Sequence, residues 1–324
     1  MRKVDLLDIW KARKRIASIA QPTSLVYSND LSDVTGKSVY LKMENWNITN
    51  SFKIRGAANK ILSLTPMERA KGITTFSTGN FGVSVGYVAK QLDINAVICI
   101  SNRVPKAKVD VLRSTGACVE VIGTSQDDAE KYSYQLQREH GFTVIHPFDD
   151  PYVIAGYGTM GLELLETLPE VDTVLAGLSG GGMHSGLGVA LKQINPKLHL
   201  IGVSTERGAA MYESMQAGKP MEVTENNTLA DSLLGGIGLN NQYTFSMVQQ
   251  YVNDILLVNE QQIAKGMAFM LDKHHQVIEG AAAASIGAIL ENKATLIGSN
   301  VVLIISGNRV DTSVVLDLAK RYSQ

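Results

Sequence analysis

The sequence contains few cysteines and no long apolar run. Only 2 cysteines, Cys99 and Cys118, occur in 324 residues, which excludes a disulfide framework and a cysteine-rich zinc cluster. Both lie in apolar stretches and are expected to be buried strand thiols in a reducing compartment. The longest run of small apolar residues, Gly280 to Leu290, is far shorter than the ~20 residues of a membrane span. We therefore expect no transmembrane segment and a cytoplasmic location.

An excess of charge of one sign is also lacking. The 30 Lys and Arg against 31 Asp and Glu leave a formal net charge of −1, which argues against a nucleic-acid partner. With 45% hydrophobic and 19% charged residues, the composition is that of a globular protein and not of a disordered chain. The length of 324 residues predicts about two domains.

Short β-rich runs alternate with helical periodicity along the chain. The predicted strands are Ser38–Lys42, Gly72–Phe76, Ala96–Ile100, Cys118–Ile122, Thr143–Ile145, Thr173–Ala176, Leu198–Val203, Ile255–Val258 and Val301–Ile305. Apolar residues at helical spacing occupy 80–92, 105–115, 126–140, 151–168, 182–194, 260–272, 280–291 and 311–322. This alternation predicts the α/β class, with parallel sheets covered on both faces. No repeat, low-complexity tract or charge block marks a linker.

A lysine beside an aromatic residue precedes one of the predicted helices. In the segment Asn50 to Ala57, Lys53 follows Phe52, and a helix is expected to begin near Ile54. A partly desolvated lysine near a cation such as Arg55 has a lowered pKa and supplies the neutral amine needed for Schiff-base chemistry. A surface lysine at a helix start is the alternative.

Two glycine-containing turns join a predicted strand to a predicted helix. In Ser77-Thr78-Gly79-Asn80-Phe81-Gly82 and in Leu178-Ser179-Gly180-Gly181-Gly182-Met183, backbone N–H groups can bind a phosphate or carboxylate. The first turn is equally compatible with helix capping by Thr78 or Asn80, and the second with a flexible turn. Neither fits G-x-G-x-x-G or a P-loop, and the first predicted strand lacks a dinucleotide fingerprint, which disfavours a dehydrogenase.

A fourth segment, Ile305 to Asn308, ends the last strand, where open parallel sheets place ligand groups.

Taken in order, these segments resemble the fold-type II pyridoxal-phosphate enzymes of the threonine/serine dehydratase and serine racemase family. The pattern Ser-Phe-Lys-x-Arg-Gly-Ala is met by Ser51 to Ala57, and the likeness spans nearly the whole chain. The resemblance implies two open α/β sheet domains, as in the tryptophan synthase β subunit, with the cofactor in the cleft between them. The large domain would comprise 1–70 and 147–324, and the small inserted domain 71–146. Family members are usually homodimers or homotetramers.

The same resemblance assigns roles to individual residues. Lys53 would bind pyridoxal 5'-phosphate covalently and move the α-proton, and Phe52 would lie at the cofactor. Asn80 would donate to the phenolic oxygen of the cofactor, and Ser306 would face its pyridine nitrogen. Two segments complete the assignment: Ser77, Thr78, Gly79, Asn80 and Phe81 would bind the substrate carboxylate, and Ser179, Gly180, Gly181, Gly182 and Met183 would hold the phosphate.

Some positions depart from the family pattern. Thr78 stands where serine racemase has the serine that acts on the second face of the substrate, so the resemblance makes Thr78 a catalytic candidate, while the change from serine disfavours racemisation. Phe81 replaces a usual histidine, and Asn47 and Asn50 also differ, which predicts a substrate larger or less polar than threonine. Glu206 and Ala210 match ligands of the family's divalent-cation site, but Tyr212 replaces a carboxylate, so Mg or Ca binding should be weak.

The implied reaction removes water from a 3-hydroxy amino acid such as threonine or serine and gives a 2-oxo acid and ammonia. A neutral Ser306 hydroxyl makes the cofactor a weaker electron sink and favours loss of the β-substituent over transamination. The stretches around Ser204 and Ala230, with Glu279, are similar to dehydratases of hydroxyectoine utilisation, which suggests a specialised amino acid substrate. Glu279 fits either a residue near the active site or a helix-start carboxylate. The alternatives are β-replacement, serine racemisation and a non-catalytic protein that binds the cofactor or a phosphorylated metabolite.

Overall fold

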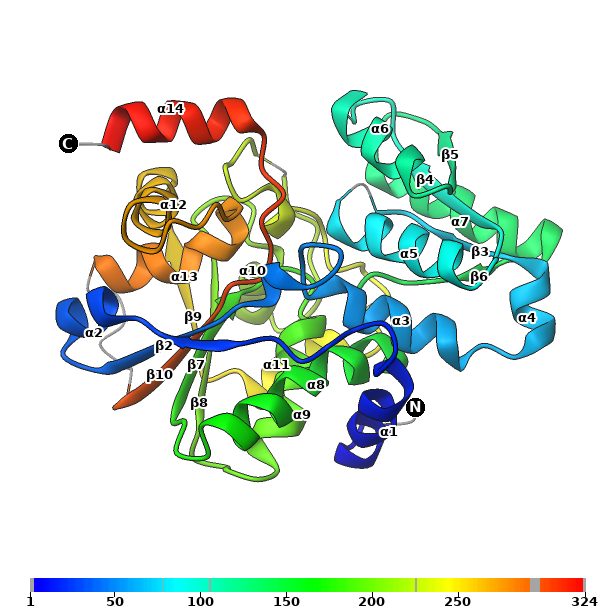
Figure 1. Ribbon diagram of the computed structural model, residues 1–324. Helices are drawn as coiled ribbons and strands as arrows, with labels where there is room; N and C mark the ends of the chain where they lie inside the picture. The colour runs from blue at the N-terminus through cyan, green and yellow to red at the C-terminus, as the bar shows by residue number, and fades with distance from the viewer. Residues whose placement is uncertain (1–2, 78, 105, 225, 292–297, 323–324) are drawn as a thin grey trace.

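The computed structural model describes residues 3–77, 79–104, 106–224, 226–291 and 298–322 and contains two β-sheets (Figure 1). The larger sheet has the strand order β1-β2-β10-β7-β8-β9. Its strands are β1 Leu25–Tyr27, β2 Ser38–Lys42, β7 Thr173–Gly177, β8 His199–Thr205, β9 Asp254–Val258 and β10 Asn300–Ile304. β1 pairs with β2 in antiparallel orientation, and the other pairs are parallel.

The smaller sheet has four strands in the order β5-β4-β3-β6, and all of its pairs are parallel. The strands are β3 Ile73–Thr75, β4 Ala96–Ile100, β5 Cys118–Val121 and β6 Thr143–Val144. These four strands are consecutive in sequence, whereas the larger sheet takes strands from both sides of them. The α/β class with two sheets, predicted from the sequence, is confirmed.

Helices connect and cover the strands. In chain order they are α1 Leu6–Ile16, α2 Asn29–Thr35, α3 Lys53–Ser63, α4 Pro66–Lys71, α5 Asn80–Gln91, α6 Lys106–Ser114, α7 Gln126–His140, α8 Pro151–Thr167, α9 Gly182–Lys192, α10 Ala210–Ala217, α11 Thr244–Tyr251, α12 Glu260–His274, α13 Gly280–Leu290 and α14 Thr312–Tyr322, with short 3-10 turns at Glu44–Trp46 and Asp231–Leu233. None of the helices among the described residues is both long and apolar enough to cross a membrane.

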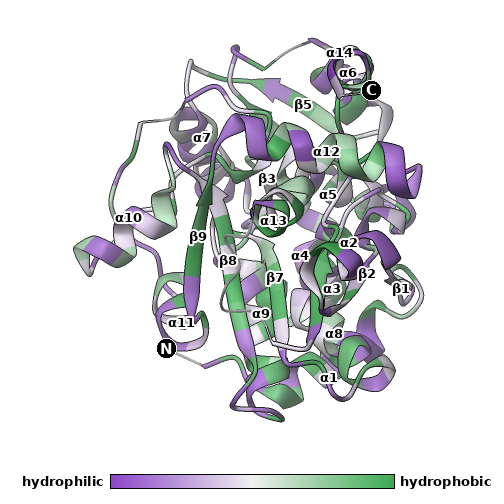
Figure 2. Ribbon diagram, turned by 90° about the vertical axis from the view of Figure 1, so that its left-hand side faces the viewer, coloured by the Kyte–Doolittle hydropathy of each residue, from purple (hydrophilic) through white to green (hydrophobic). Residues whose placement is uncertain are grey.

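Both faces of the larger sheet are buried, as its sequence of consecutive apolar residues requires. In β10, Val302 and Ile304 face a core cluster with side chains of α3, α8 and α9, whereas Val301 and Leu303 face a cluster with α12 and α13. The hydropathy view shows the apolar character of β7 and β8 between these layers (Figure 2). The first cluster also includes side chains of α5, so it joins the two sheets.

One cysteine differs from the expectation. Cys99 is buried in β4, but Cys118 is exposed. The reason is the position of β5 at the edge of the smaller sheet, where it pairs with β4 alone. An apolar stretch on an edge strand is shielded less than one in the middle of a sheet, so the expected burial of Cys118 is wrong.

Candidate active site

Lys53 is the first residue of α3 and lies beside the end of β10. The backbone N–H of Phe52 donates to the carbonyl oxygen of Ser306 at 3.1 Å, and Ser51 forms an isolated bridge with Gly307. Residues that are more than 250 positions apart are thereby brought to the same edge of the larger sheet. The structure thus places Ser306, predicted from the end of the last strand, next to the lysine segment.

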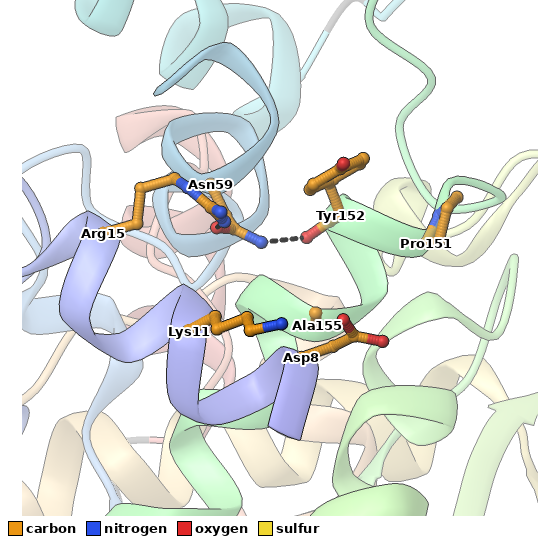
Figure 3. Close-up of a pocket in the computed structure, with 7 residues that line it drawn as sticks. All are labelled: Asp8, Lys11, Arg15, Asn59, Pro151, Tyr152 and Ala155. Carbon is orange, nitrogen blue, oxygen red and sulfur yellow. Dashed lines mark hydrogen bonds between the residues drawn. The ribbon is translucent and has the colours of Figure 1, made fainter. Parts of the chain in front are cut away.

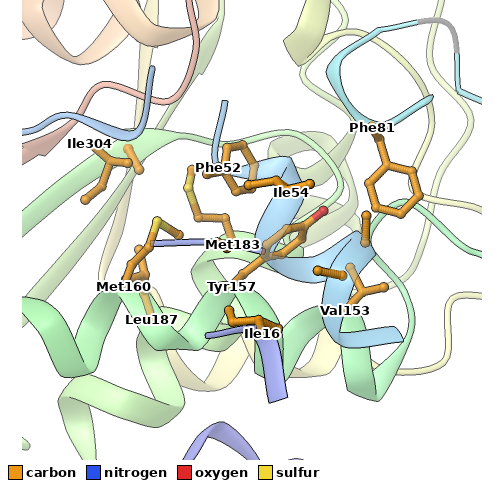
Figure 4. Packing of buried hydrophobic residues seen from close by; sticks show 14 of the residues in the cluster. Ile16, Phe52, Ile54, Phe81, Val153, Tyr157, Met160, Met183, Leu187 and Ile304 are labelled. Atoms are coloured by element: carbon orange, nitrogen blue, oxygen red, sulfur yellow. The ribbon is translucent and has the colours of Figure 1, made fainter. Parts of the chain in front are cut away.

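Three aromatic rings surround the amine of Lys53. Its Nζ lies 4.9 Å from the ring centre of Phe52, 5.5 Å from that of Tyr157 and 6.0 Å from that of Phe81. Figure 4 shows these rings within the core cluster, together with Met183. Burial lowers the pKa of the Lys53 ammonium to about 8, and the charge of Glu279 opposes this change. At this pKa roughly a tenth of the amine is neutral at pH 7, far more than for an ordinary lysine.

A buried network of charges fixes α3 behind the lysine. Arg55, 1% exposed, pairs with the carboxylates of Glu44 and Glu163 at 2.8 and 2.6 Å. Lys42 pairs with Glu163 at 2.5 Å, so two cations face two anions. Such a network is stable only when every member has its partner, and it therefore sets the position of α3 tightly. Because Arg55 is held by carboxylates in this way, it does not act as the free cation that the sequence suggested beside Lys53.

The other half of α3 is held by Asn59. Its amide nitrogen donates to the carbonyl oxygen of Tyr152 at 2.7 Å, and its amide oxygen accepts from Arg15 at 2.5 Å. These contacts border a hollow of about 140 Å³ between α1, α3 and α8 (Figure 3). Lys11 and Asp8 are among the residues that line the hollow, and none of the predicted site residues lines it.

Asn80 begins α5 and faces a buried carboxylate. Its Nδ2 lies 3.0 and 2.9 Å from the two carboxylate oxygens of Glu279, which is 4% exposed. Burial raises the pKa of the Glu279 carboxyl to about 7; Asp231 adds to the rise, while Asn80, Arg309 and Lys53 oppose it. Glu279 therefore lies next to Asn80 and also immediately precedes α13, so both descriptions from the sequence apply, and its role at the site stays a prediction.

The glycine turn after β7 lacks room for any side chain. Gly181 has φ +82, and an added Cβ would lie 2.8 Å from Met211 and Val248. At Gly182 an added Cβ would lie 2.9 Å from the carbonyl oxygen of Phe148. The turn leads into α9, whose first N–H groups have no acceptor within the helix. This is the geometry of an anion site at a helix start.

The remaining predicted residues are distributed around these features. Ser179 donates to the carbonyl oxygen of Leu234 at 3.5 Å. Gly79 immediately precedes α5, and Phe81 is buried in the core cluster at 1% exposure. Ser77 lies between β3 and α5, and Thr78 lies outside the described residues. Sequence reasoning missed Tyr157 and Phe148, because their contacts with Lys53 and the glycine turn arise only from tertiary packing.

The residues considered for a divalent cation follow β8 in the chain. Glu206 directly follows β8, and Ala210 and Tyr212 belong to α10. In the part of the chain that the structure describes, no group of three or more His, Cys, Asp or Glu side chains is arranged to hold a metal ion. Cation binding at Glu206 and Ala210 stays a prediction.

The site's polar groups fit a phosphorylated aldehyde cofactor. The buried hydroxyls Ser51 Oγ and Ser185 Oγ belong to the lysine segment and to the first turn of α9, and neither has a hydrogen-bond partner in the described part of the chain. The glycine turn offers backbone donors of the kind that bind phosphate, and the buried amine can form a Schiff base. The residues present therefore fit pyridoxal phosphate.

Comparison with known proteins agrees with this geometry. Residues 16–307 match the model of the family described as pyridoxal-phosphate dependent enzymes. The chain is 39% identical over 312 residues to the L-threonine ammonia-lyase of Thermotoga maritima, covering 96% of this chain and 77% of that protein. The structure of maize serine racemase superposes with a TM-score of 0.91 at 31% identity, covering 99% and 98% of the two chains. The serine racemase of Dictyostelium discoideum gives a TM-score of 0.87 at 33% identity, covering 95% and 99%. The chain thus belongs to the pyridoxal-phosphate dependent enzymes, in the branch of the threonine and serine dehydratases that its lysine motif indicated.

Proposed function

We propose that the protein is a pyridoxal-phosphate dependent dehydratase that converts a 3-hydroxy amino acid into a 2-oxo acid and ammonia. The observation that carries this proposal is the amine of Lys53, buried among three aromatic rings beside Ser306. The family match and the threonine ammonia-lyase relative support the reaction class. Threonine is the first substrate to test, because 39% identity extends over 96% of the chain.

The cofactor, when bound, supplies an electron sink that acidifies the α-carbon of an attached amino acid. Lys53 would hold it covalently, and once the amino group of the substrate has taken its place on the cofactor, the freed Lys53 amine would accept the α-proton. Phe52 would line one side of the cofactor, and Ser179 to Met183 would bind its phosphate. The β-hydroxyl leaves with a proton as water. Hydrolysis of the remaining carbon–nitrogen bond then consumes one water and releases the 2-oxo acid and ammonia.

Ser306 would face the pyridine nitrogen. It is 5% exposed and carries no charge, so it does not enforce a proton on the ring as a carboxylate would. The weaker electron sink favours loss of the β-substituent over transamination.

Ser77 to Phe81 would bind the substrate carboxylate at the start of α5. Because the Phe81 ring is buried in the core cluster, this residue would contribute its backbone N–H group and not its side chain. The same ring lies 6.0 Å from Nζ of Lys53, so it would border the space that an amino acid substrate occupies. Thr78, expected to be catalytic, stays a proposal from the family pattern.

Three further features belong to the proposal. Residues 71–146 would form the small inserted domain, and 1–70 with 147–324 the large one; the separate pairing of β3 to β6 supports this division. The protein would act in the cytoplasm. It would also form a homodimer or homotetramer, which analytical ultracentrifugation tests.

The experiment is release of 2-oxo acid and ammonia from L-threonine, L-serine, 3-hydroxyaspartate, β-phenylserine and a hydroxyectoine-derived amino acid. Turnover of threonine or serine is expected. Turnover of only a bulkier compound would identify a specialised dehydratase, and trapping by added sulfide or inversion of serine would favour β-replacement or racemisation. Silence on all substrates, with the cofactor bound, would indicate a binding protein and overturn the proposal.

A further inference from the structure

Glu279 connects three segments next to the lysine. It immediately precedes α13, and its two oxygens accept from Nδ2 of Asn80 at the start of α5. Its Oε2 also accepts from the backbone N–H of Arg309, 3.1 Å away, in the segment after β10. α5 packs on the smaller sheet and α13 on the larger one. The carboxylate therefore links the two sheets at the site.

The charge state of this carboxylate decides which way the Asn80 amide faces. An ionised carboxylate only accepts hydrogen bonds, so the amide nitrogen points to Glu279 and the amide oxygen away from it. That oxygen is buried and has no hydrogen-bond partner among the residues that the structure describes. A protonated carboxyl has an O–H donor, which can pair with the amide oxygen instead. The two protonation states thus favour opposite orientations of the same amide.

We propose that ionised Glu279 is a positioning residue, which turns the amide of Asn80 so that an N–H group is available to the phenolic oxygen of the cofactor, and that protonation of Glu279 releases this orientation. The inference rests on the proposed function. An amide nitrogen carries two N–H groups, so one can stay on Glu279 while the other serves the cofactor. A reversed amide would direct its oxygen to the cofactor's oxygen, which is repulsive.

The surroundings of Glu279 keep it in place and set the pH at which it changes. An added Cβ at Gly307 would lie 2.8 Å from Oε1, so the carboxyl group is closely confined. The charges of Lys53 on α3, Asp231 in the 3-10 turn Asp231–Leu233 and Arg309 act on it, and the backbone N–H of Arg309 also donates to it. With a carboxyl pKa of about 7, the change in orientation falls in the neutral range.

The test is a pH titration of the visible absorbance maximum of the lysine-bound cofactor, in the wild type and in Glu279→Gln. The wild type should show a step with its midpoint near pH 7, and E279Q should show none. The glutamine side chain in E279Q has one acceptor oxygen, which the backbone N–H of Arg309 occupies. The amide nitrogen of the glutamine then faces Asn80 and favours the reversed orientation of the Asn80 amide. At pH 8 we expect E279Q to bind pyridoxal phosphate about tenfold more weakly, the effect of one hydrogen bond.

A double-mutant cycle separates positioning from a general structural role. Asn80→Ala should abolish the step, and adding E279Q to N80A should weaken cofactor binding no further. Glu260→Gln, a change at another helix-start carboxylate, is the matched control and should behave as the wild type.

Three results would overturn the inference: a wild type without the step, a step that persists in E279Q, or full additivity of the two variants. If E279Q fails to fold, the N80A variant alone tests the inference. An absorbance step that persists in N80A would overturn it, because that variant has no Asn80 amide whose orientation could change. A protein that never shows lysine-dependent absorbance would instead refute the proposed function, so the two failures are distinguishable.

Discussion

Arg55 and Glu44 form a two-point ion pair: Nε lies 2.8 Å from Oε2, and Nη2 lies 2.8 Å from Oε1. The opposite side of the same guanidinium contacts Glu163. Both partners in the first pair are at most 1% exposed. Since Arg55 is two residues after Lys53, this pairing fixes the start of α3 relative to the buried core.

Removing Arg55 should therefore destabilise the fold strongly. Arg55→Met removes the cation that pairs directly with both Glu44 and Glu163, and we expect a loss of about 3–5 kcal/mol in the free energy of unfolding. The surface pair Arg13 and Glu166 provides the matched control, because its side chains are 32% and 50% exposed. Arg13→Met should cost no more than about 1 kcal/mol. Urea titration measures both, and equal losses would show that the buried network is unimportant.

The sequence predicted most of the elements that carry the site, but not all contacts among them. The segments at Lys53, Asn80, Gly180 to Gly182 and Ser306 follow strands or begin helices, and these local patterns could be read directly. The short helices α2, α4, α10 and α11 were not predicted, because 6 to 8 residues give too little periodicity. α1 was also missed, since its many charged residues obscure the buried stripe of Ile9, Ala12 and Ile16.

The charge partners were the least predictable part. Nothing near Arg55 in the sequence indicates that Glu163, 108 residues away, lies 2.6 Å from it. Asn80 and Glu279 are separated by 199 residues and meet only because the two sheets pack together. A local pattern identifies the residue types that chemistry needs, whereas packing decides which of them are paired and which stay reactive.

The amine of Lys53 should react at a lower pH than an ordinary lysine. Its pKa is lowered to about 8. The rate at which a small amount of acetylating reagent modifies Lys53 in the cofactor-free protein should therefore reach half of its maximum near pH 8, against about 10.4 in the unfolded chain. Raising the pH removes the proton, so labelling increases with pH. Mass spectrometry of the peptide containing Lys53 measures the curve. An identical midpoint in folded and unfolded protein would contradict the lowered pKa.

The burial of Glu279 should make stability fall with rising pH. Its carboxyl has a folded-state pKa of about 7, above its ordinary 4.5, so between these values the folded state binds more protons than the unfolded state. Stability from this group is complete below pH 4.5 and decreases up to pH 7, by at most about 3 kcal/mol. E279Q should have a flatter profile than the wild type over that range, whatever its absolute stability. Thermal melts of the cofactor-free proteins at several pH values measure the slopes, and parallel profiles would count against the raised pKa.

The glycine turn should tolerate no side chain when the cofactor binds. Gly181→Ala places a Cβ 2.8 Å from Met211 and Val248 at a φ of +82, whereas Gly218→Ala meets nothing within 4 Å at a φ of +70. Both variants should lose about 1–2 kcal/mol of stability from the left-handed backbone. Only G181A moves the turn that offers N–H groups to the phosphate, so we expect its affinity for pyridoxal phosphate to fall by at least about tenfold. Fluorescence titration of the cofactor-free proteins measures this affinity. Equal affinities in G181A and G218A would mean that the phosphate binds elsewhere, because strain of the backbone is common to both and the crowded turn is not.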